Sequence, residues 1–286
     1  MHEVREATTG EVYAKKIINL GNRGYDSEAL EYNAQAEFDT MKKLTHIHIV
    51  RVLITQKEFD SFTILMLPVA DQDLRAYLEM CIKDEYPLEA LSSILHWFGC
   101  LLHALAFAHR CSVIHQDVKP SNVLVKDEGG RRQIYLADFG IAKDFSDRSA
   151  SATVNDNVRG TPVYRAPEVR PRQARGRAAD IFSLGCVFSE MFTVCCGRSL
   201  EQYQEFRRAR DKENQLAFRE NLSKVSSWLH DLAVTQDENE DSGGVILLLI
   251  RQMMREDPDR RPTAAKAIQT LKNTDKPSDL FCPNCI

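Results

Sequence analysis

The feature that most constrains this chain of 286 residues is a polar segment followed closely by an acidic triplet. Residues 113–122 read Val-Ile-His-Gln-Asp-Val-Lys-Pro-Ser-Asn, and residues 138–140 read Asp-Phe-Gly. Between them, short apolar runs flank a polar stretch at 126–132, a pattern that predicts a β-hairpin. The hairpin would bring both polar segments to one place. Carboxylates, a lysine and an amide gathered there would suit general-base and metal-ion chemistry.

Composition narrows the class of protein. Hydrophobic residues make up 43% of the chain and charged residues 27%, as is usual for a folded globular domain. The net charge of −4 argues against a nucleic-acid-binding surface, which needs a concentrated basic excess. The longest strongly apolar run, residues 245–250, is far shorter than the roughly 20 residues of a membrane span. We therefore expect neither a nucleic-acid partner nor a membrane partner.

The eight cysteines are scattered, and several lie in apolar helical patterns. This predicts reduced thiols in an intracellular protein, cytoplasmic or nuclear, rather than a disulfide framework. The tail contains the pair Cys282 and Cys285, but a zinc site needs two more ligands and the sequence makes none evident, so we expect no metal there. His96, His103 and His109 also lack a completing carboxylate or thiol, which predicts ordinary helix histidines.

The motifs resemble the catalytic core of eukaryotic protein kinases. His115-Gln116-Asp117 stands where that family has His-Arg-Asp, and Asp-Phe-Gly at 138–140 matches its metal-binding triplet. Residues 160–168, Gly-Thr-Pro-Val-Tyr-Arg-Ala-Pro-Glu, are similar to the family's peptide-docking segment. Lys119 and Thr161 look like the serine/threonine branch. The resemblance covers about residues 3–272.

This resemblance implies an α+β, two-lobed protein-kinase-like fold. A small antiparallel β-sheet lobe with one helix is expected at 1–67, and a larger, mainly helical lobe at 68–272. Together they would form a kinase domain at 1–272, followed by a C-terminal tail at 273–286. The implied activity is transfer of the γ-phosphoryl group of ATP to serine or threonine of protein substrates.

The resemblance also assigns residues to the reaction. Asp117 would accept or orient the substrate hydroxyl proton, and Lys119 would steady the γ-phosphate. Asn122 and Asp138 would bind Mg²⁺, a hard cation that prefers oxygen ligands. Asp180 would accept backbone hydrogen bonds from the catalytic loop, serve as a helix N-cap, or do both.

A second group would bind ATP. Strand periodicity puts Ala14 and Lys16 on one face, which favours Lys16 over Lys15 as the phosphate-binding lysine. Glu37, with Glu31 as its rival, would pair with this lysine from a helix expected at 28–45. The other expected ATP contacts are Met66 at the back of the adenine pocket, Val69 in the hinge, Asp73 at the ribose (or as a helix N-cap) and Leu124 beneath the adenine.

Glu168 is expected to form a buried ion pair with Arg261 across 93 residues, with Arg260 as the adjacent rival.

Two departures from the family pattern leave alternatives open. No G-x-G-x-x-G precedes Lys16, which suggests a fragment or an abbreviated product. Gln116 replaces an arginine that pairs with an activation-loop phosphate, which Gln cannot do. The alternative functions are a pseudokinase-like scaffold or binding module and, disfavoured by the docking segment, a small-molecule phosphotransferase. Substrate and oligomeric state stay open.

Overall fold

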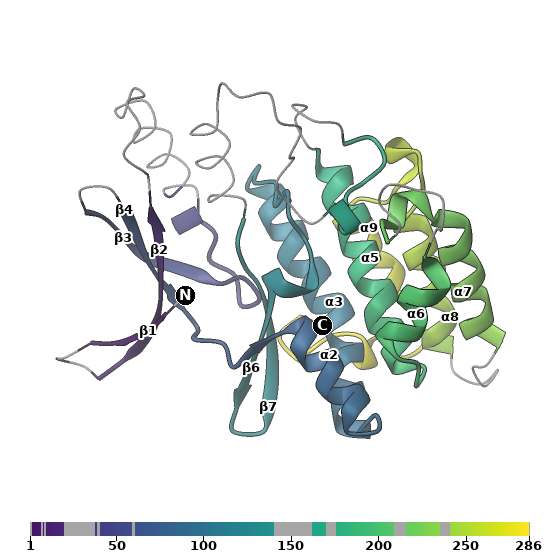
Figure 1. Ribbon diagram of the computed structural model, residues 1–286, viewed down its shortest axis with the longest axis horizontal. Coiled ribbons are helices and arrows are strands. Elements are labelled where there is room, and N and C mark those ends of the chain that lie inside the picture. Colours follow the sequence, from purple (N-terminus) through teal and green to yellow (C-terminus); the bar gives the residue numbers. More distant parts are fainter. Residues whose placement is uncertain are drawn as a thin grey trace.

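The structure is a computed structural model that describes residues 2–6, 8, 10–19, 38, 41–58, 61–139, 162–169, 176–208, 216–234 and 241–285. Figure 1 shows a lobe of β-strands beside a larger lobe that consists mostly of helices. The predicted α+β, two-lobed fold is confirmed.

The small lobe is built on an antiparallel sheet with the strand order β1-β2-β4-β3. Its strands are β1 (His2–Arg5), β2 (Val12–Asn19), β3 (Arg51–Glu58) and β4 (Ser61–Leu67). Ala14 pairs with Met66 and Lys16 with Ile64. Of the helix expected at 28–45, the described part includes Phe38 and Met41, both buried as the apolar spacing predicts.

A second sheet, ordered β5-β6-β7, lies at the start of the large lobe. It consists of β5 (Gln72–Asp73), β6 (Val123–Glu128) and β7 (Arg131–Leu136). The turn between β6 and β7 is shorter than the polar stretch suggested, because Gly129 and Gly130 both take positive φ, 65° and 91°, and close a two-residue hairpin. At the other end of the hairpin, the amide of Ala137 donates to the carbonyl of Asn122 (2.9 Å).

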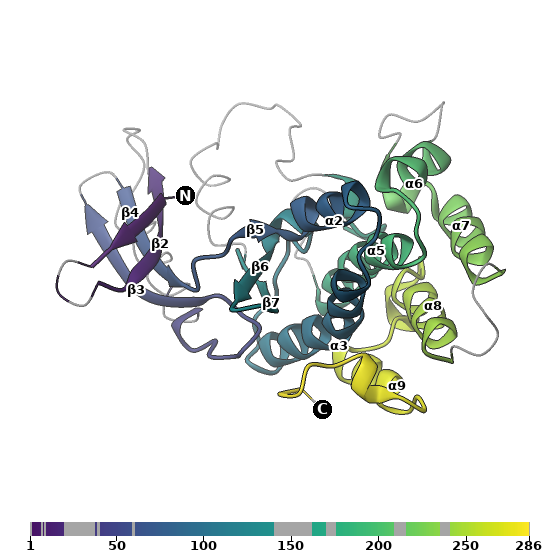
Figure 2. The ribbon, with the colours of Figure 1, turned by 90° about the horizontal axis from the view of Figure 1, so that it is seen from below.

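Helices form the rest of the large lobe, with α3 and α5 at its centre (Figures 1 and 2). Phe98 of α3 packs edge-on against Phe188 of α5, with the ring centroids 4.7 Å apart. The helices are α2 (Leu74–Lys83), α3 (Leu88–Arg110), α5 (Arg177–Cys195), α6 (Leu200–Arg207), α7 (Leu222–Val234), α8 (Asp241–Met253) and α9 (Ala264–Lys272). Short 3₁₀ turns occur at η1 (Pro120–Asn122), η2 (Pro162–Tyr164), η3 (Phe218–Glu220), η4 (Pro258–Arg260) and η5 (Pro277–Asp279).

One helix boundary differs slightly from what the sequence pattern predicts. The acidic, glycine-containing stretch 236–244 favours a loop, and a helix is expected from Gly243 to Met254; α8 begins two residues earlier, at Asp241, and ends at Met253. Ile246 and Leu249, one turn apart on this helix, are fully buried. Tertiary packing of the apolar face therefore outweighs the low helix propensity of the two glycines.

Two of the described helices, α3 and α5, have the length and mean hydropathy (1.5 and 1.4) of a membrane span. However, 61% and 83% of their apolar windows are buried inside the lobe. Their hydropathy is what central core helices require, and it is weak support for a membrane role.

The chain after α9 returns to α3 (Figure 2). The amide of Gly99 donates to the carbonyl of Leu280 (3.0 Å), and Leu280 and Phe281 are buried. A Cβ atom on Gly99 would lie 2.2 Å from the Phe281 ring, so only glycine permits this approach. The tail is thus packed into the large lobe.

Candidate active site

The predicted catalytic residues of the loop before β6 contact one another. The Asp117 carboxylate oxygen Oδ2 forms an ion pair with Lys119 Nζ (2.9 Å) and accepts a hydrogen bond from Asn122 Nδ2 (3.1 Å). Asn122 Nδ2 also donates to the backbone carbonyl of Asp117 (2.8 Å). The 3₁₀ turn η1 brings Asn122 back towards Asp117. A carboxylate, an ammonium group and an amide therefore form one compact cluster.

Asp180, the fourth residue of α5, anchors this loop by hydrogen bonds to its backbone. Its Oδ2 accepts from the amide of His115 and its Oδ1 from the amide of Gln116, both at 2.8 Å. His109 of α3 lies 2.9 Å from Oδ2 as well. The predicted tie between Asp180 and the catalytic loop is confirmed. The N-cap alternative is wrong, because Gly176 occupies that position.

We expect Asp180→Asn to destabilise the fold by about 1.5–3 kcal/mol, because an amide NH₂ would face a backbone N–H that needs an acceptor. Denaturant unfolding measures this loss of stability. Asp84→Asn, at an exposed position, is the matched control and should change stability by less than about 0.5 kcal/mol. Equal stability of the two variants would contradict the prediction.

The rings of His115 and Phe139 pack against each other, with their centroids 4.5 Å apart, and so join the His115–Asp117 motif to the motif that begins at Asp138. Burial lowers the pKa of His115, which favours the neutral ring. In that form Nε2–H donates to the carbonyl of Ala137 (2.8 Å), and Nδ1 accepts from the amide of Asp117 (3.3 Å). Both the segment before Asp138 and the backbone of Asp117 are thereby fixed to one imidazole.

Two of the five non-glycine residues with positive φ in the described part of the chain lie in these motifs. Gln116 has φ of 69° and Asp138 has φ of 61°, in the left-handed region that residues other than glycine rarely adopt. Each lies within one of the two motifs, and such conformations cost of order 1–3 kcal/mol unless the surroundings enforce them. Here the hydrogen bond from the Gln116 amide to Asp180 and the one from His115 to the carbonyl of Ala137, next to Asp138, hold the backbone in place.

Lys16 of β2 forms an ion pair with Asp138, 122 residues later in the chain. Their side chains are 21% and 37% exposed, so the pair lies at the edge of the interior and is open to a ligand. The strand alternation that favoured Lys16 over Lys15 is consistent with this placement. A cation from the small lobe thus meets an acid from the large lobe.

A cavity of about 400 Å³ lies between the two sheets. This volume is within the usual range of small-molecule pockets. It is lined by every predicted nucleotide-binding residue of the adenine and ribose region, namely Ala14, Met66, Val69, Asp73 and Leu124, and by Asp138. Asp73 is also the N-cap of α2, accepting from the amide of Ala76 (2.9 Å), so the cap alternative is confirmed alongside its position in the cavity.

Sequence analysis missed several lining residues. Glu3 faces Ala14 across the β1–β2 ladder, so the strand register could have identified it. The others are Val50, Pro68, Ala70, Gln72, Ser121 and Ala137. Most of these residues lie next to a predicted contact in the sequence, and that proximity is the feature by which the sequence could have revealed them.

This arrangement can be compared with known proteins. A family model described as "Protein kinase domain" matches residues 1–271. The chain belongs to the protein kinase family. It is 26% identical to cyclin-dependent kinase 4 of Sus scrofa over 294 residues, covering 94% of this chain and 90% of the relative. It is also 30% identical to the calcium/calmodulin-dependent protein kinase cmkA of Emericella nidulans over 268 residues, covering 93% of this chain and 58% of that protein.

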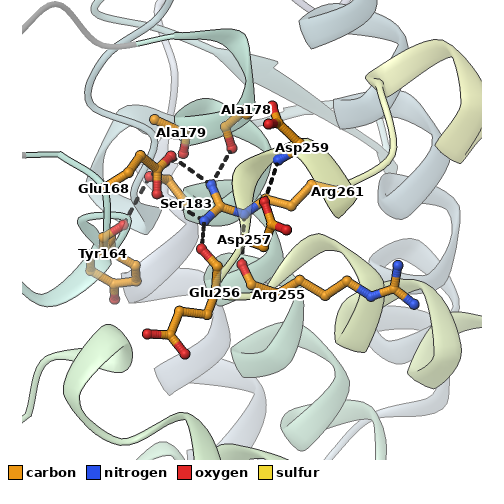
Figure 3. Close-up of polar contacts among 10 residues, drawn as sticks. All are labelled: Tyr164, Glu168, Ala178, Ala179, Ser183, Arg255, Glu256, Asp257, Asp259 and Arg261. Carbon is orange, nitrogen blue, oxygen red and sulfur yellow. Dashed lines mark hydrogen bonds and ion pairs between the residues drawn. The ribbon is translucent and has the colours of Figure 1, made fainter.

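The kinase domain contains the predicted ion pair between Glu168 and Arg261 (Figure 3). Arg261 NH1 and NH2 donate to the two carboxylate oxygens at 2.7 and 2.8 Å, a bidentate arrangement. Arg261 also donates to three backbone carbonyls, those of Ala178, Arg255 and Glu256, at 2.7–2.9 Å. The prediction is confirmed, and the rival Arg260 is exposed.

Other predicted residues of the kinase domain lie outside the described part of the chain. They are Glu31, Glu37, Gly140 and Thr161, together with the candidate phosphorylation residues Ser146, Ser149, Ser151 and Thr153. The pairing of Glu37 with Lys16 stays a prediction.

One cluster contradicts the sequence analysis. The expectation that Cys282 and Cys285 lack further ligands is wrong, because the fold places His48 and Cys100 beside them. The four ligand atoms lie within 4.8 Å of one another. The missing partners come from a loop before β3 and from the middle of α3. Long-range packing, which no local spacing reveals, brings them together.

Proposed function

We propose that this kinase domain transfers the γ-phosphoryl group of ATP to serine or threonine hydroxyls of protein substrates. The observation that carries the proposal is the cluster of Asp117, Lys119 and Asn122, which lies on the loop that leads into the β6–β7 hairpin, and this hairpin ends two residues before Asp138. Phosphoryl transfer depends on positioning and on charge stabilisation more than on covalent chemistry. A rigid loop that carries both a base and a cation meets that need.

The adenosine part of ATP fits the cavity. Ala14, Met66 and Leu124 provide apolar walls, and Asp73 adds a carboxylate suited to ribose hydroxyls. Val69, in the hinge between the lobes, brings backbone groups that could bind the adenine edge. A mostly apolar pocket with a few polar groups is typical of small-molecule sites.

The donor set also fits Mg²⁺. Asn122 donates its two bonds to Asp117 through Nδ2, so its amide oxygen is the atom that would bind metal. Asp138 adds a carboxylate, and hard oxygen ligands are what Mg²⁺ prefers. The ion would neutralise charge on the phosphates of the nucleotide. Lys16, paired with Asp138, would bind the same phosphates.

Asp117 is the proposed base for the acceptor hydroxyl. Its carboxylate is 14% exposed and Lys119 Nζ lies 2.9 Å away, close enough for one loop to orient the hydroxyl and steady the transferring group. Lys119 supports serine and threonine as acceptors through the family resemblance. The eight free cysteines suit a reducing compartment, so we place the protein inside the cell.

A pseudokinase-like scaffold is the alternative. It is favoured by the exposed Gln116, which cannot form an ion pair with a phosphate. Retention of Lys16, Asp117, Asn122 and Asp138 favours the enzyme.

Calorimetry of Mg-ATP binding tests the nucleotide site. Asp138→Asn should weaken Mg-ATP binding by at least about tenfold, because it removes the charge of a proposed ligand, and even the loss of a group that only supports a ligand commonly costs 10–100-fold in metal affinity. In EDTA, the variant and the wild type should bind ATP alike. Asp127→Asn, on the hairpin outside the cavity, is the control and should bind normally.

A peptide array with serine, threonine and tyrosine acceptors then separates the two functions. Binding with transfer to serine or threonine supports the enzyme. Binding without transfer above the Asp117→Asn background supports the scaffold. Absence of binding in every variant would reject the proposed nucleotide site.

A further inference from the structure

The cluster that joins the tail to α3 has the composition of a metal site. His48 lies in the loop before β3, Cys100 in the middle of α3, and Cys282 and Cys285 in the tail. Their imidazole nitrogen and three sulfur atoms all lie within 4.8 Å of one another. His48, Cys100 and Cys285 are 3%, 0% and 4% exposed, and Cys282 is partly buried. Four ligand atoms thus converge on one enclosed point.

We propose that His48, Cys100, Cys282 and Cys285 bind one structural zinc ion. Tetrahedral zinc with Zn–S near 2.3 Å and Zn–N near 2.0–2.1 Å requires ligand atoms about 3.5–3.8 Å apart. The observed separations are at most 4.8 Å, and that between His48 Nε2 and Cys282 Sγ is 3.3 Å, so side-chain movements of up to about 1 Å would complete the tetrahedron. Four protein ligands fill the tetrahedron, so the site has a structural rather than a catalytic role.

The orientation of His48 supports the proposal. Its Nδ1 lies 2.8 Å from the carbonyl of Ile134, an acceptor, so Nδ1 carries the proton. The unprotonated Nε2 then points at the cluster, 3.3 Å from Cys282 Sγ. Metal-binding histidines usually have this arrangement, in which a backbone carbonyl fixes the tautomer and the ring orientation.

The tail is shaped to present its two thiols. The amide of Cys285 donates to the carbonyl of Cys282 (2.9 Å), which folds the intervening residues into a tight turn. Cys-x-x-Cys is the usual spacing for two zinc ligands from one turn. Next to Cys100, Gly99 lets Phe281 approach the helix and donates to the carbonyl of Leu280. The backbone contacts therefore place the turn directly over Cys100.

The ligand chemistry selects zinc over other ions. Three thiolates and an imidazole disfavour Mg²⁺ and Ca²⁺, which take oxygen ligands. A disulfide between two of the three clustered cysteines would account for only two of the four side chains. It would not explain why the third thiol and His48 lie beside them. All eight cysteines are free in the structure.

The position of the site suggests what the metal would do. The amide of Leu136 donates to the carbonyl of His48 (2.8 Å), and the amide of Val50 donates to that of Leu136 (3.0 Å). Leu136 lies two residues before Asp138. The zinc ion would thus fasten the tail to α3 and to the loop that pairs with the strand leading to Asp138.

Metal analysis of the full chain, purified without a polyhistidine tag, tests the proposal. We expect one zinc ion per chain by plasma mass spectrometry. Cys282→Ser and Cys285→Ser should each bind zinc at least about tenfold more weakly than the wild type, because each removes one of the four ligands, and should lose it to a competing chelator first. Cys111→Ser, an exposed cysteine at the end of α3 and outside the cluster, should retain the zinc.

Two measurements on the wild type keep the test valid if the variants do not fold. X-ray absorption should give three sulfur neighbours near 2.3 Å and one nitrogen near 2.0–2.1 Å. Alkylation followed by mass spectrometry should find Cys100, Cys282 and Cys285 protected until a chelator is added, with Cys111 reactive throughout. A zinc-free chain that takes up no added zinc, a Cys282–Cys285 disulfide, bound iron, or wild-type zinc affinity in folded Cys282→Ser and Cys285→Ser would each overturn the proposal.

Discussion

Asp117→Asn will reduce phosphoryl transfer by about 10²–10⁴-fold, the usual contribution of a general base. Mg-ATP affinity should change little. The substitution keeps the size of the side chain, and asparagine retains an oxygen that can accept from Lys119 or Asn122, so the cluster stays assembled. What is lost is the negative charge that accepts or orients the hydroxyl proton. Single-turnover transfer assays and calorimetry on one preparation would separate the two quantities.

The control for this experiment is Asp127→Asn, which removes a carboxylate from the exposed hairpin between β6 and β7. It should transfer at the wild-type rate. If Asp117→Asn loses ATP binding and transfer to the same extent, Asp117 acts in nucleotide binding and its role as base is wrong. If transfer is unchanged, the chain uses another group.

The contact between Asp117 and Asn122 could be predicted from sequence because both lie on one loop, and a single hairpin carries the chain from that loop to Asp138. The number of residues between the two motifs suits a hairpin, and a hairpin returns the chain to its starting point. A local sequence pattern therefore predicts which residues lie close together in the fold. Asp180 and Arg261 lie much further along the chain and were predicted through the family resemblance. Their contacts are also backbone hydrogen bonds and a bidentate ion pair, which leave little freedom in geometry.

Other features depend on packing that local pattern does not contain. The start of α8 at Asp241 follows from burial of Ile246 and Leu249, which outweighs the glycines before them. The turn between β6 and β7 is shorter than the sequence analysis expects, although Gly129 and Gly130 are a pair that two-residue hairpin turns favour. The cysteine cluster required knowing that the tail returns to Gly99, a contact between distant segments.

Arg261→Ala will have the largest effect on stability, with a loss of about 3–5 kcal/mol, as when one partner of a buried ion pair is removed. The guanidinium side chain is fully buried, and the Glu168 side chain is 30% exposed. The variant would leave Glu168 without its partner and would also deprive three backbone carbonyls of a donor. Arg261→Lys should recover only part of the loss, because an ammonium group cannot donate to both carboxylate oxygens in the planar arrangement.

Arg260→Ala is the matched control, since it removes the adjacent arginine from an exposed position and should change stability by less than about 0.5 kcal/mol. If the two alanine variants unfold with equal denaturant slopes, denaturant unfolding gives the difference in stability between them directly.

A second comparison uses Glu168→Gln, Arg261→Met and the double variant. If the ion pair carries the effect, the double variant should be more stable than the sum of the single losses implies. If Arg261 acts mainly through the carbonyls of Ala178, Arg255 and Glu256, the losses should add. Equal stability of Arg261→Ala and Arg260→Ala would mean that neither set of contacts holds the docking segment in place.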